Sequence, residues 1–372
     1  MNIEKSSKKE EIQFGKVLNI AGAFIALLIG SGFATGQEVM QYFASYGIYG
    51  FLGVLAIFLL LTYVGRSFIM VGHKEQFEKG NDIFSYYCGP YLGKFYDYFS
   101  IFFLFLSVIV MVAGASAIGV QHYNWSNYLG GSLLGILAII TVIFGLNKIV
   151  EVIGKIGPII VVLSILVSVI TIAQNWNQVD IADITMKAND LVDAKKIHRA
   201  SANWFLAAGS YVGFCMLWLA AFLSQVGKTS RSRREARIGA EAGAGGFSLA
   251  VLLMSAALMF KLDDIAGSQI PSLLLAEDLH HILANIFSII IFLGIYTTSV
   301  PLLWTVSSRF SEEKTTKFKV ITIVLGTIAI IIGLKLEFDQ LINYVYVING
   351  YIGILLLLIM IFKDIMKITK KN

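Results

Sequence analysis

Ten apolar segments run along the chain, each long enough to cross a lipid bilayer as a helix, and they constrain its fold more than any other feature. Hydrophobic residues make up 57% of the 372 residues and charged residues only 14%. A soluble fold cannot hide so much apolar surface, so we expect an all-α membrane protein with ten transmembrane helices. The predicted spans are 17–46, 48–70, 93–120, 128–146, 151–173, 203–226, 238–260, 282–306, 318–334 and 341–362.

The basic residues alternate between the connections in a way that orients the chain. With the N-terminus in the cytoplasm, the cytoplasmic segments hold 23 of the 29 Lys and Arg residues and the outer segments hold 6. Cytoplasmic loops carry such an excess of positive charge, so both termini are expected inside. This placement accounts for the net charge of +5, and no nucleic-acid partner is expected.

A long polar connection, 174–202, divides the chain near its midpoint, with five predicted spans on each side. An odd number of helices per half inserts the second half upside down, which is the geometry of inverted-repeat transporters. The alternative is ten helices without internal symmetry. The expected divisions are a cytoplasmic tail, the first repeat, the outer connection, the second repeat and a second tail, at 1–16, 17–173, 174–202, 203–362 and 363–372. The other long outer connection, 261–281, is expected to hold a hairpin of short helices.

The first span contains the sharpest local signal, a run from Ile29 to Glu38 with three glycines and several polar residues. Each glycine costs a helix about 1 kcal/mol relative to alanine. Backbone left unpaired at membrane depth must line a cavity or find a ligand, and we predict a helix broken around Gly30, Ser31 and Gly32. The alternative is close helix packing through small residues, which the spacing of Gly32 and Gly36 also fits.

The sixth span is the matching helix of the second half, and Gly209, Ser210, Tyr211 and Gly213 lie in its middle. We therefore predict that it is discontinuous as well, because paired interruptions point to a transporter site. The eighth span holds Thr297, Thr298 and Ser299 before a proline. Hydroxyl oxygens suit a cation such as Na⁺, but they also bond back to carbonyls one turn earlier.

Ionisable and amide groups mark a possible gate near the outer side. Glu38 and Gln37 follow the predicted break, and an ionisable residue at membrane depth indicates function. We expect Glu38 to gate, carry a proton or meet an amine, with a solvated outer carboxylate as the alternative. Asn343 and Tyr346 in the last span are expected to face it.

Catalytic and cofactor motifs are missing from the sequence. It has no Walker loop, zinc-binding His-Glu-x-x-His or nucleophile elbow, and its cysteines and histidines lack metal-ligand spacing. The adjacent pair His280 and His281 is interpreted as the start of a helix. We expect neither an enzyme nor an organic cofactor.

The stretch Ser31 to Glu38 resembles the signature of the YkvI-type bacterial membrane proteins. The whole chain looks like a member of the amino acid–polyamine–organocation superfamily, with the five-plus-five fold of bacterial leucine transporters. The resemblance implies a multi-pass protein of the bacterial cytoplasmic membrane. The chain departs from better-known members in having ten spans rather than twelve, and in carrying Gln37 and Glu38 where a gate arginine is expected.

The resemblance also implies residue roles. A Na⁺ ion would lie between the first and eighth helices, held by the carbonyls of Ala26 and Ile29 and the hydroxyls of Thr297 and Thr298. Solute would meet the backbone of the first break and the sixth helix. The predicted solute contacts are Gly30, Ser31, Gly32, Tyr211, Val212, Gly213 and Met216.

Together these features predict a secondary transporter that moves a small organic solute, an amino acid or an amine, by alternating access with Na⁺ or H⁺ as coupling ion. Solute binding and coupling at adjoining sites make the two affinities reciprocal. The alternative is a transporter-like nutrient sensor that binds solute and signals. The lipid bilayer and the small solute are the expected partners.

Overall fold

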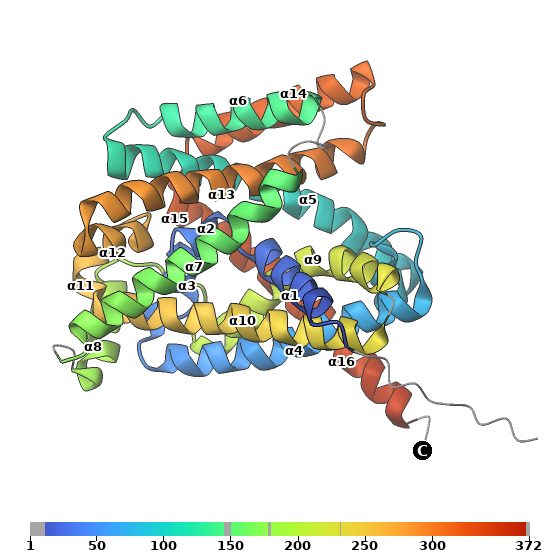
Figure 1. Cartoon of the computed structure of the whole chain (residues 1–372), viewed down its shortest axis with the longest axis horizontal. Coiled ribbons are helices and arrows are strands. Elements are labelled where there is room, and N and C mark those ends of the chain that lie inside the picture. Colours follow the sequence, from blue (N-terminus) through green and yellow to red (C-terminus); the bar gives the residue numbers. More distant parts are fainter. Residues whose placement is uncertain (1–11, 145–149, 178–179, 231, 370–372) are drawn as a thin grey trace, which may run out of the picture.

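The computed structural model describes residues 12–144, 150–177, 180–230 and 232–369. Helices connected by short turns account for nearly all of this part of the chain (Figure 1). The α-helices are α1 Phe14–Leu28, α2 Ser31–Ala34, α3 Gln37–Tyr42, α4 Tyr49–Glu75, α5 Asp82–Tyr123, α6 Leu129–Phe144, α7 Val150–Asn175, α8 Ile181–Asp193, α9 Trp204–Thr229, α10 Arg233–Phe260, α11 Leu262–Ile265, α12 Pro271–Leu279, α13 His281–Ser308, α14 Thr316–Gly333, α15 Phe338–Leu341 and α16 Val347–Thr369. A 3₁₀ turn, Ala44–Tyr46, follows α3, and a π-helical turn, Ile342–Tyr346, joins α15 to α16.

Eight of the described helices are long and apolar enough to cross a membrane by length and composition. They are α4, α5, the part of α7 from Pro158, α9, α10, α13, α14 and the continuous stretch Phe338–Lys367. Helices α1 and α6 are apolar but shorter. Every predicted span is therefore mainly helical where the structure describes it, with interruptions in the first span, and the all-α membrane fold is confirmed at this level.

Side-chain caps fix where several of these helices begin. Asn203 accepts a hydrogen bond from the backbone N–H of Leu206 at 2.9 Å at the start of α9. Thr315 accepts one from Phe318 at 3.1 Å at the start of α14. Such caps satisfy N–H groups that lack a partner inside the helix, so they define its first turn.

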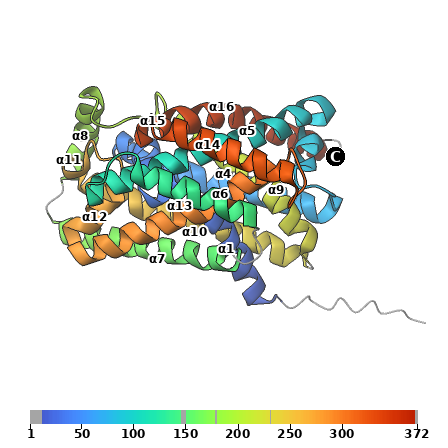
Figure 2. The same cartoon turned by 90° about the horizontal axis from the view of Figure 1, so that it is seen from above.

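The helices pack as two groups. Helices α1, α4, α9 and α10 contact one another, and α5, α6, α13 and α14 form a second set of mutual contacts. In Figures 1 and 2, α6 and α14 lie side by side on the outside of the second group. Helix α7 touches both α10 and α13, and α16 packs along α9. The two groups meet around α2 and α3.

The short connecting helices α8, α11 and α12 lie together at one end of the bundle, and α16 ends at the opposite end (Figures 1 and 2). Both long connections that were predicted outside thus lie on the same side. The predicted hairpin of short helices is present as α11 and α12. The imidazole of His280 accepts a hydrogen bond from Ile282 N–H at 3.1 Å and caps α13, as expected for a helix start.

Two connections contain more helix than expected. The segment between the second and third predicted spans holds the end of α4 and the start of α5, which is kinked where Gly89 has a φ of 76° just before Pro90. Glycine reaches this left-handed backbone region without a Cβ clash, so the helix can change direction there. The long polar connection 174–202 holds α8, whose first turn is capped by Asp180.

The predicted discontinuity of the sixth span is wrong, because α9 is one unbroken helix from Trp204 to Thr229. Its glycines serve packing. A Cβ on Gly213 would lie 2.0 Å from the carbonyl oxygen of Gly350, and a Cβ on Gly353 would lie 2.0 Å from that of Gly213. The two backbones approach this closely only because small residues face each other, as in other small-residue seams between membrane helices.

Candidate solute site at the interrupted first helix

The first helix is broken at Gly30, as predicted. Helix α1 ends at Leu28, and Gly30 has an extended backbone with φ −95° and ψ −164°. The Gly30 N–H bonds to Leu28 O at 3.1 Å instead of to Ala26 O, its partner in a regular helix. Within the described residues, the carbonyl oxygens of Ala26 and Ile29 accept no hydrogen bond. The break therefore releases the two carbonyls that were predicted as cation ligands.

A second break follows one turn later, and sequence reasoning missed it. Gly36 separates α2 from α3 and has a φ of 80°, in the left-handed region. The hairpin of α11 and α12 enters this break: Ser272 at the start of α12 donates its N–H to Thr35 O at 3.0 Å and its hydroxyl to Ala34 O at 2.7 Å. A Cβ on Gly36 would lie 3.0 Å from Ser272 N, so glycine permits this approach.

The second break turns Glu38 back toward the first. Glu38 is fully buried, and its Oε2 accepts a hydrogen bond from the Tyr211 hydroxyl at 3.3 Å. A Cβ on Gly32 would lie only 1.9 Å from Glu38 Oε1, so the carboxyl packs directly against the Gly32 backbone. Glu38 therefore lies beside the first break and not beyond it, because α3 begins anew after the left-handed turn at Gly36.

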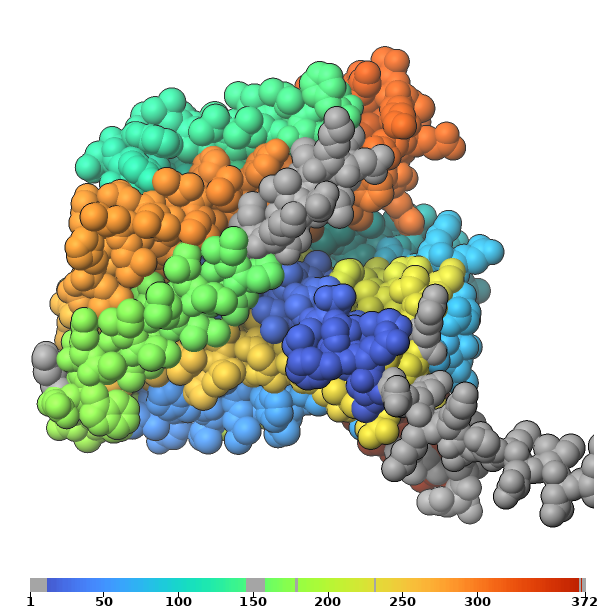
Figure 3. All heavy atoms as spheres, viewed as in Figure 1, coloured from blue at the N-terminus to red at the C-terminus, as the bar shows by residue number. Residues whose placement is uncertain are grey.

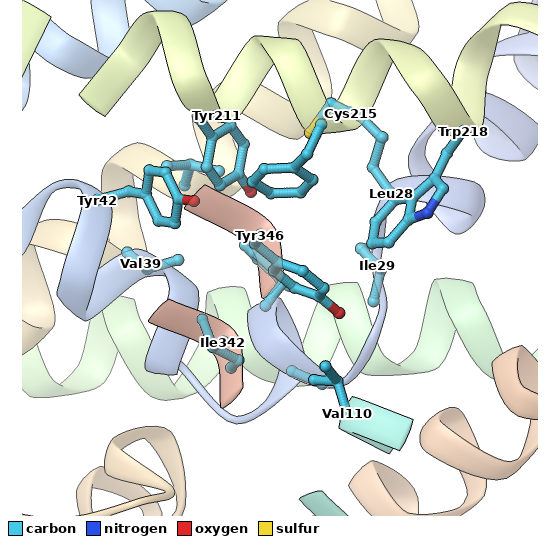
Figure 4. Packing of buried hydrophobic residues seen from close by; sticks show 14 of the residues in the cluster. Leu28, Ile29, Val39, Tyr42, Val110, Tyr211, Cys215, Trp218, Ile342 and Tyr346 are labelled. Atoms are coloured by element: carbon cyan, nitrogen blue, oxygen red, sulfur yellow. The ribbon is translucent and has the colours of Figure 1, made fainter. Parts of the chain in front are cut away.

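Aromatic rings surround this region. Tyr211 lies 5.2 Å from Tyr42 and 4.8 Å from Phe214 between ring centroids, and Phe214 lies 4.9 Å from Tyr346. Trp218 continues the cluster, 5.7 Å from Tyr346. Figure 4 shows Tyr42, Tyr211 and Tyr346 together, with Trp218 on the side of Leu28 and Ile29. We call Tyr42, Tyr211, Phe214, Trp218 and Tyr346 the aromatic cage.

Several buried polar atoms in the cage region have no hydrogen-bond partner of normal geometry among the described residues. These atoms are Ser31 Oγ, Glu38 Oε1, Tyr42 OH, Trp218 Nε1 and Tyr346 OH. Most buried polar groups in proteins are paired, so a group of unpaired ones needs an explanation. They come from the first, sixth and last membrane helices, and a bound ligand is the partner that would satisfy them.

The predicted gate residues separate into two places. Tyr346 belongs to the cage. Asn343 is not part of the cage, and its side-chain amide donates to Gln41 Oε1 at 3.0 Å and to Arg199 O at 3.1 Å. Gln37 is buried, and its Oε1 has no partner among the described residues. Asn343 and Tyr346 both lie in the π-helical turn, a feature frequent at functional sites. Asn343 therefore contacts Gln41 and not Glu38.

The predicted cation ligands of the eighth span lie on α13, and α13 packs against α2. The Thr297 and Thr298 hydroxyls donate to Gly294 O at 2.9 and 3.0 Å, which is the back-bonding considered as the alternative. Their oxygen lone pairs stay available as acceptors. The Na⁺ site stays a prediction.

On α9, Tyr211 faces Glu38 while Gly213 faces α16. Gly213 therefore packs against α16, and its contact with solute stays a prediction. At 100° per residue, Val212 and Met216 lie about 100° and about 140° around the helix from Tyr211. Both are buried, and their contact with solute stays a prediction.

A cavity of about 450 Å³ opens at the end of the bundle opposite the hairpin. It is lined by residues of α1, α9 and α10, among them Lys16, Thr229 and Glu235. Glu235 Oε1 accepts a hydrogen bond from Gln13 N–H at 2.7 Å, which ties α10 to the start of α1. Figure 3 shows the dark blue atoms of α1 at the surface beside the yellow atoms of this region.

Comparison with known proteins confirms the predicted resemblance. The chain is 24% identical over 342 residues to YyaD and 23% identical over 345 residues to the membrane protein YkvI, both from Bacillus subtilis. Each alignment covers 91% of this chain and 94% of the relative. No model of a known protein family matches the chain.

Solved structures with the leucine-transporter-type fold are similar to the whole chain. MhsT in complex with L-phenylalanine has a TM-score of 0.59 at 15% identity, covering 93% of this chain and 88% of MhsT. The manganese transporter of Eremococcus coleocola has a TM-score of 0.56 at 14% identity, with coverages of 93% and 79%. Inward-facing Mhp1 has a TM-score of 0.52 at 14% identity, with coverages of 93% and 75%. These similarities establish the fold.

Proposed function

We propose that this protein is a secondary transporter of a small organic solute, an amino acid or an amine, which works by alternating access coupled to Na⁺ or H⁺. One observation carries the proposal: a twice-interrupted membrane helix whose released carbonyls and unpartnered buried polar groups converge in the centre of the fold. Irregular backbone at membrane depth is typical of transporter binding sites. No catalytic motif in the sequence competes with this interpretation.

The proposal includes a topology. Helices α1 to α3 count as the first span and α6 as the fourth, which gives ten spans, and the polar connection 174–202 separates two inverted repeats of five. Both termini then lie in the cytoplasm, and the hairpin α11–α12 lies outside. The short lengths of α1 and α6 are compatible with this count because neighbouring helices and interfacial residues accommodate short spans.

The packing supports a division into moving parts. The group α1, α4, α9 and α10 has its own mutual contacts, and so does the group α5, α6, α13 and α14. Rocking of the first group against the second would open the cage region alternately to each side. The cavity between α1, α9 and α10 supplies space on the inner side, and the contact of Ser272 with the second break closes the outer side.

Two groups are candidates for coupling. Na⁺ would bind the carbonyls of Ala26 and Ile29 with the hydroxyls of Thr297 and Thr298, since hard cations prefer oxygen ligands. H⁺ would bind Glu38, a buried ionisable residue at membrane depth. Uptake measured under a Na⁺ gradient and under a pH gradient distinguishes the two coupling ions.

Uptake into proteoliposomes tests the function. The purified chain is reconstituted alone, and entry of labelled amino acids and amines is measured under a Na⁺ gradient, a pH gradient or neither. We expect one solute to accumulate under one gradient. Thr298→Ala should remove a Na⁺ dependence, whereas Ser299→Ala should keep it, because the Ser299 hydroxyl bonds to Ile295 O at 2.7 Å and is not a predicted ligand. Solute binding without entry or exchange would contradict transport and favour the sensor.

A further inference from the structure

We infer that the solute is a small organic cation without a carboxylate, an amine or ammonium compound, and that Glu38 is its counter-ion. This inference rests on the proposed function, since it specifies the solute of the same site. It depends on three features of the described residues: the unpaired carboxyl of Glu38, the aromatic cage, and the contact between Glu38 and Gly32.

Glu38 lacks a cationic partner. Its Oε2 is 3.3 Å from the Tyr211 hydroxyl, and its Oε1 has no partner among the described residues. No ion pair with Lys, Arg or His reaches it in that part of the chain. A buried charge is stable only when it is paired and hydrogen-bonded, so an ionised Glu38 requires a positive group that the described residues do not supply. A bound ammonium group supplies that charge together with N–H or N–CH₃ contacts.

The cage has the chemistry that recognises ammonium groups. Tyr42, Tyr211, Phe214 and Tyr346 are fully buried and lie within 5.7 Å of at least one other ring of the set. The face of an aromatic ring carries negative charge density, and cages of such rings bind methylated ammonium ligands. The unpartnered hydroxyls of Tyr42 and Tyr346 accept hydrogen bonds from a primary amine equally well.

The same geometry works against an amino acid. An amino acid bound through its carboxylate would place that group at the backbone of the first break. There the Glu38 carboxyl already lies against Gly32, at 1.9 Å from where a Cβ would stand. A solute carboxylate placed beside an ionised Glu38 at this backbone would be repelled strongly in a medium of low dielectric constant. An amine that lacks the carboxylate keeps the attraction to Glu38 and avoids the repulsion.

Protons and the organic cation are expected to compete for the same group, the Glu38 carboxyl. The titratable groups that face Glu38 are Tyr42 on α3, Tyr211 and Cys215 on α9, and Tyr346 on the π-helical turn, and none is basic. Glu38 holds either a proton or the ammonium group. When the cation binds to the protonated form, the carboxyl O–H bond breaks, the proton leaves to solvent and the electron pair stays on the carboxylate. Affinity therefore falls as the pH is lowered.

Equilibrium binding to the purified full-length chain tests the inference. Isothermal titration calorimetry is performed with matched pairs: 2-phenylethylamine with L-phenylalanine, and 3-methylbutylamine with L-leucine. We expect at least one amine to bind about tenfold or more tightly than its parent amino acid, a difference that one well-placed charge interaction supplies. Titrations in two buffers of different ionisation enthalpy should reveal proton release on binding.

Variants identify the counter-ion. Glu38→Gln keeps the shape of the side chain and removes the charge, so it should weaken amine binding about tenfold or more and abolish its pH dependence. Glu241→Gln is the matched control, because Glu241 lies on α10 away from the cage, where it pairs with Arg237 at 3.6 Å. The Glu241→Gln protein should bind the amine as tightly as the wild-type protein does. The pH dependence and proton release of the wild-type protein test the role of Glu38 even where a variant fails to fold.

The outcomes separate this inference from the proposed function. Tighter binding of the amino acids, no binding of any amine, or unchanged binding in Glu38→Gln would each overturn the organic-cation site. Accumulation of an amino acid in liposomes would overturn the solute class and leave the transporter intact. Amine binding that depends on Glu38, without entry or exchange in liposomes, would support the cation site and overturn transport.

Discussion

Glu38 and Gly32 determine the centre of the molecule at the scale of single residues. They are six positions apart in the sequence, and only the left-handed turn at Gly36 brings the carboxyl back onto the Gly32 backbone. Ser272 then hydrogen-bonds the carbonyls of Ala34 and Thr35 that the turn releases. The glycines of this stretch therefore have different roles, because Gly30 breaks the helix, Gly32 accommodates the carboxyl and Gly36 reverses the chain.

We predict that Gly32→Ala destabilises the protein by about 1–3 kcal/mol, the usual cost of forcing extra volume into a packed core. The new Cβ would lie 1.9 Å from Glu38 Oε1 and 2.3 Å from Cδ and Cγ, so the carboxyl must move. Thermal unfolding of the purified protein measures the loss. In a Glu38→Ala background the obstructing side chain is absent, and the same substitution should cost clearly less. Equal costs in the two backgrounds would contradict the contact.

Sequence reasoning identified the residues of this centre better than their arrangement. The run of glycines correctly predicted a break at Gly30. Glu38, selected as an ionisable residue of the first span, is buried, and its role stays a prediction. The second break was not predictable, because it depends on contact with α12, a segment more than 200 residues away in the sequence. Tyr42 was missed because its ring contacts are with Tyr211 and Phe214 on α9, far away in the sequence, although it lies four residues after Glu38 on the same helix.

At the scale of elements, α9 shows how one glycine pattern serves two different structures. Three glycines and a neighbouring run of polar residues interrupt the first helix, whereas Gly209 and Gly213 leave α9 continuous. In α9 the glycines face α16, where Gly350 and Gly353 complete the seam. A pattern of small residues in one sequence does not tell a break from a close contact, and this is why the sixth span was predicted wrongly.

The close packing of α9 against α16 predicts that alanine has opposite effects on stability at Gly213 and at Gly209, one turn apart on α9. Gly213→Ala would place a Cβ 2.0 Å from Gly350 O, a backbone atom that moves only if the helices separate, so we expect a loss of about 1–3 kcal/mol. Gly209→Ala meets only the side chain of Ile354 at 3.4 Å and should gain up to about 1 kcal/mol from helix propensity. Thermal unfolding of both variants measures the difference. A stable Gly213→Ala protein would show that α9 and α16 are less tightly packed.

At the scale of the whole molecule, two patterns read from the sequence agree with the packing. Each apolar segment contains helix where the structure describes it, as predicted, because a bilayer leaves a backbone few other ways to satisfy its hydrogen bonds. The distribution of basic residues assigned the connections to two sides, and α8, α11 and α12 indeed share one end (Figures 1 and 2). Neither pattern predicts which helices contact one another, so the sequence did not indicate the two packed groups of helices.

The side of each connection is a prediction that cysteine labelling checks. In a background with Cys88→Ala and Cys215→Ala, single cysteines replace Lys187, Asp263 or Glu312, which are exposed on α8, on α11 and after α13. A membrane-impermeant maleimide should label the first two in intact cells and the third only after permeabilisation, because the ten-span topology places only Lys187 and Asp263 outside. All three should react in permeabilised cells, which controls for accessibility. If Lys187 and Asp263 reacted from opposite sides, an odd number of crossings would lie between them, and the paired repeats of five helices would be wrong.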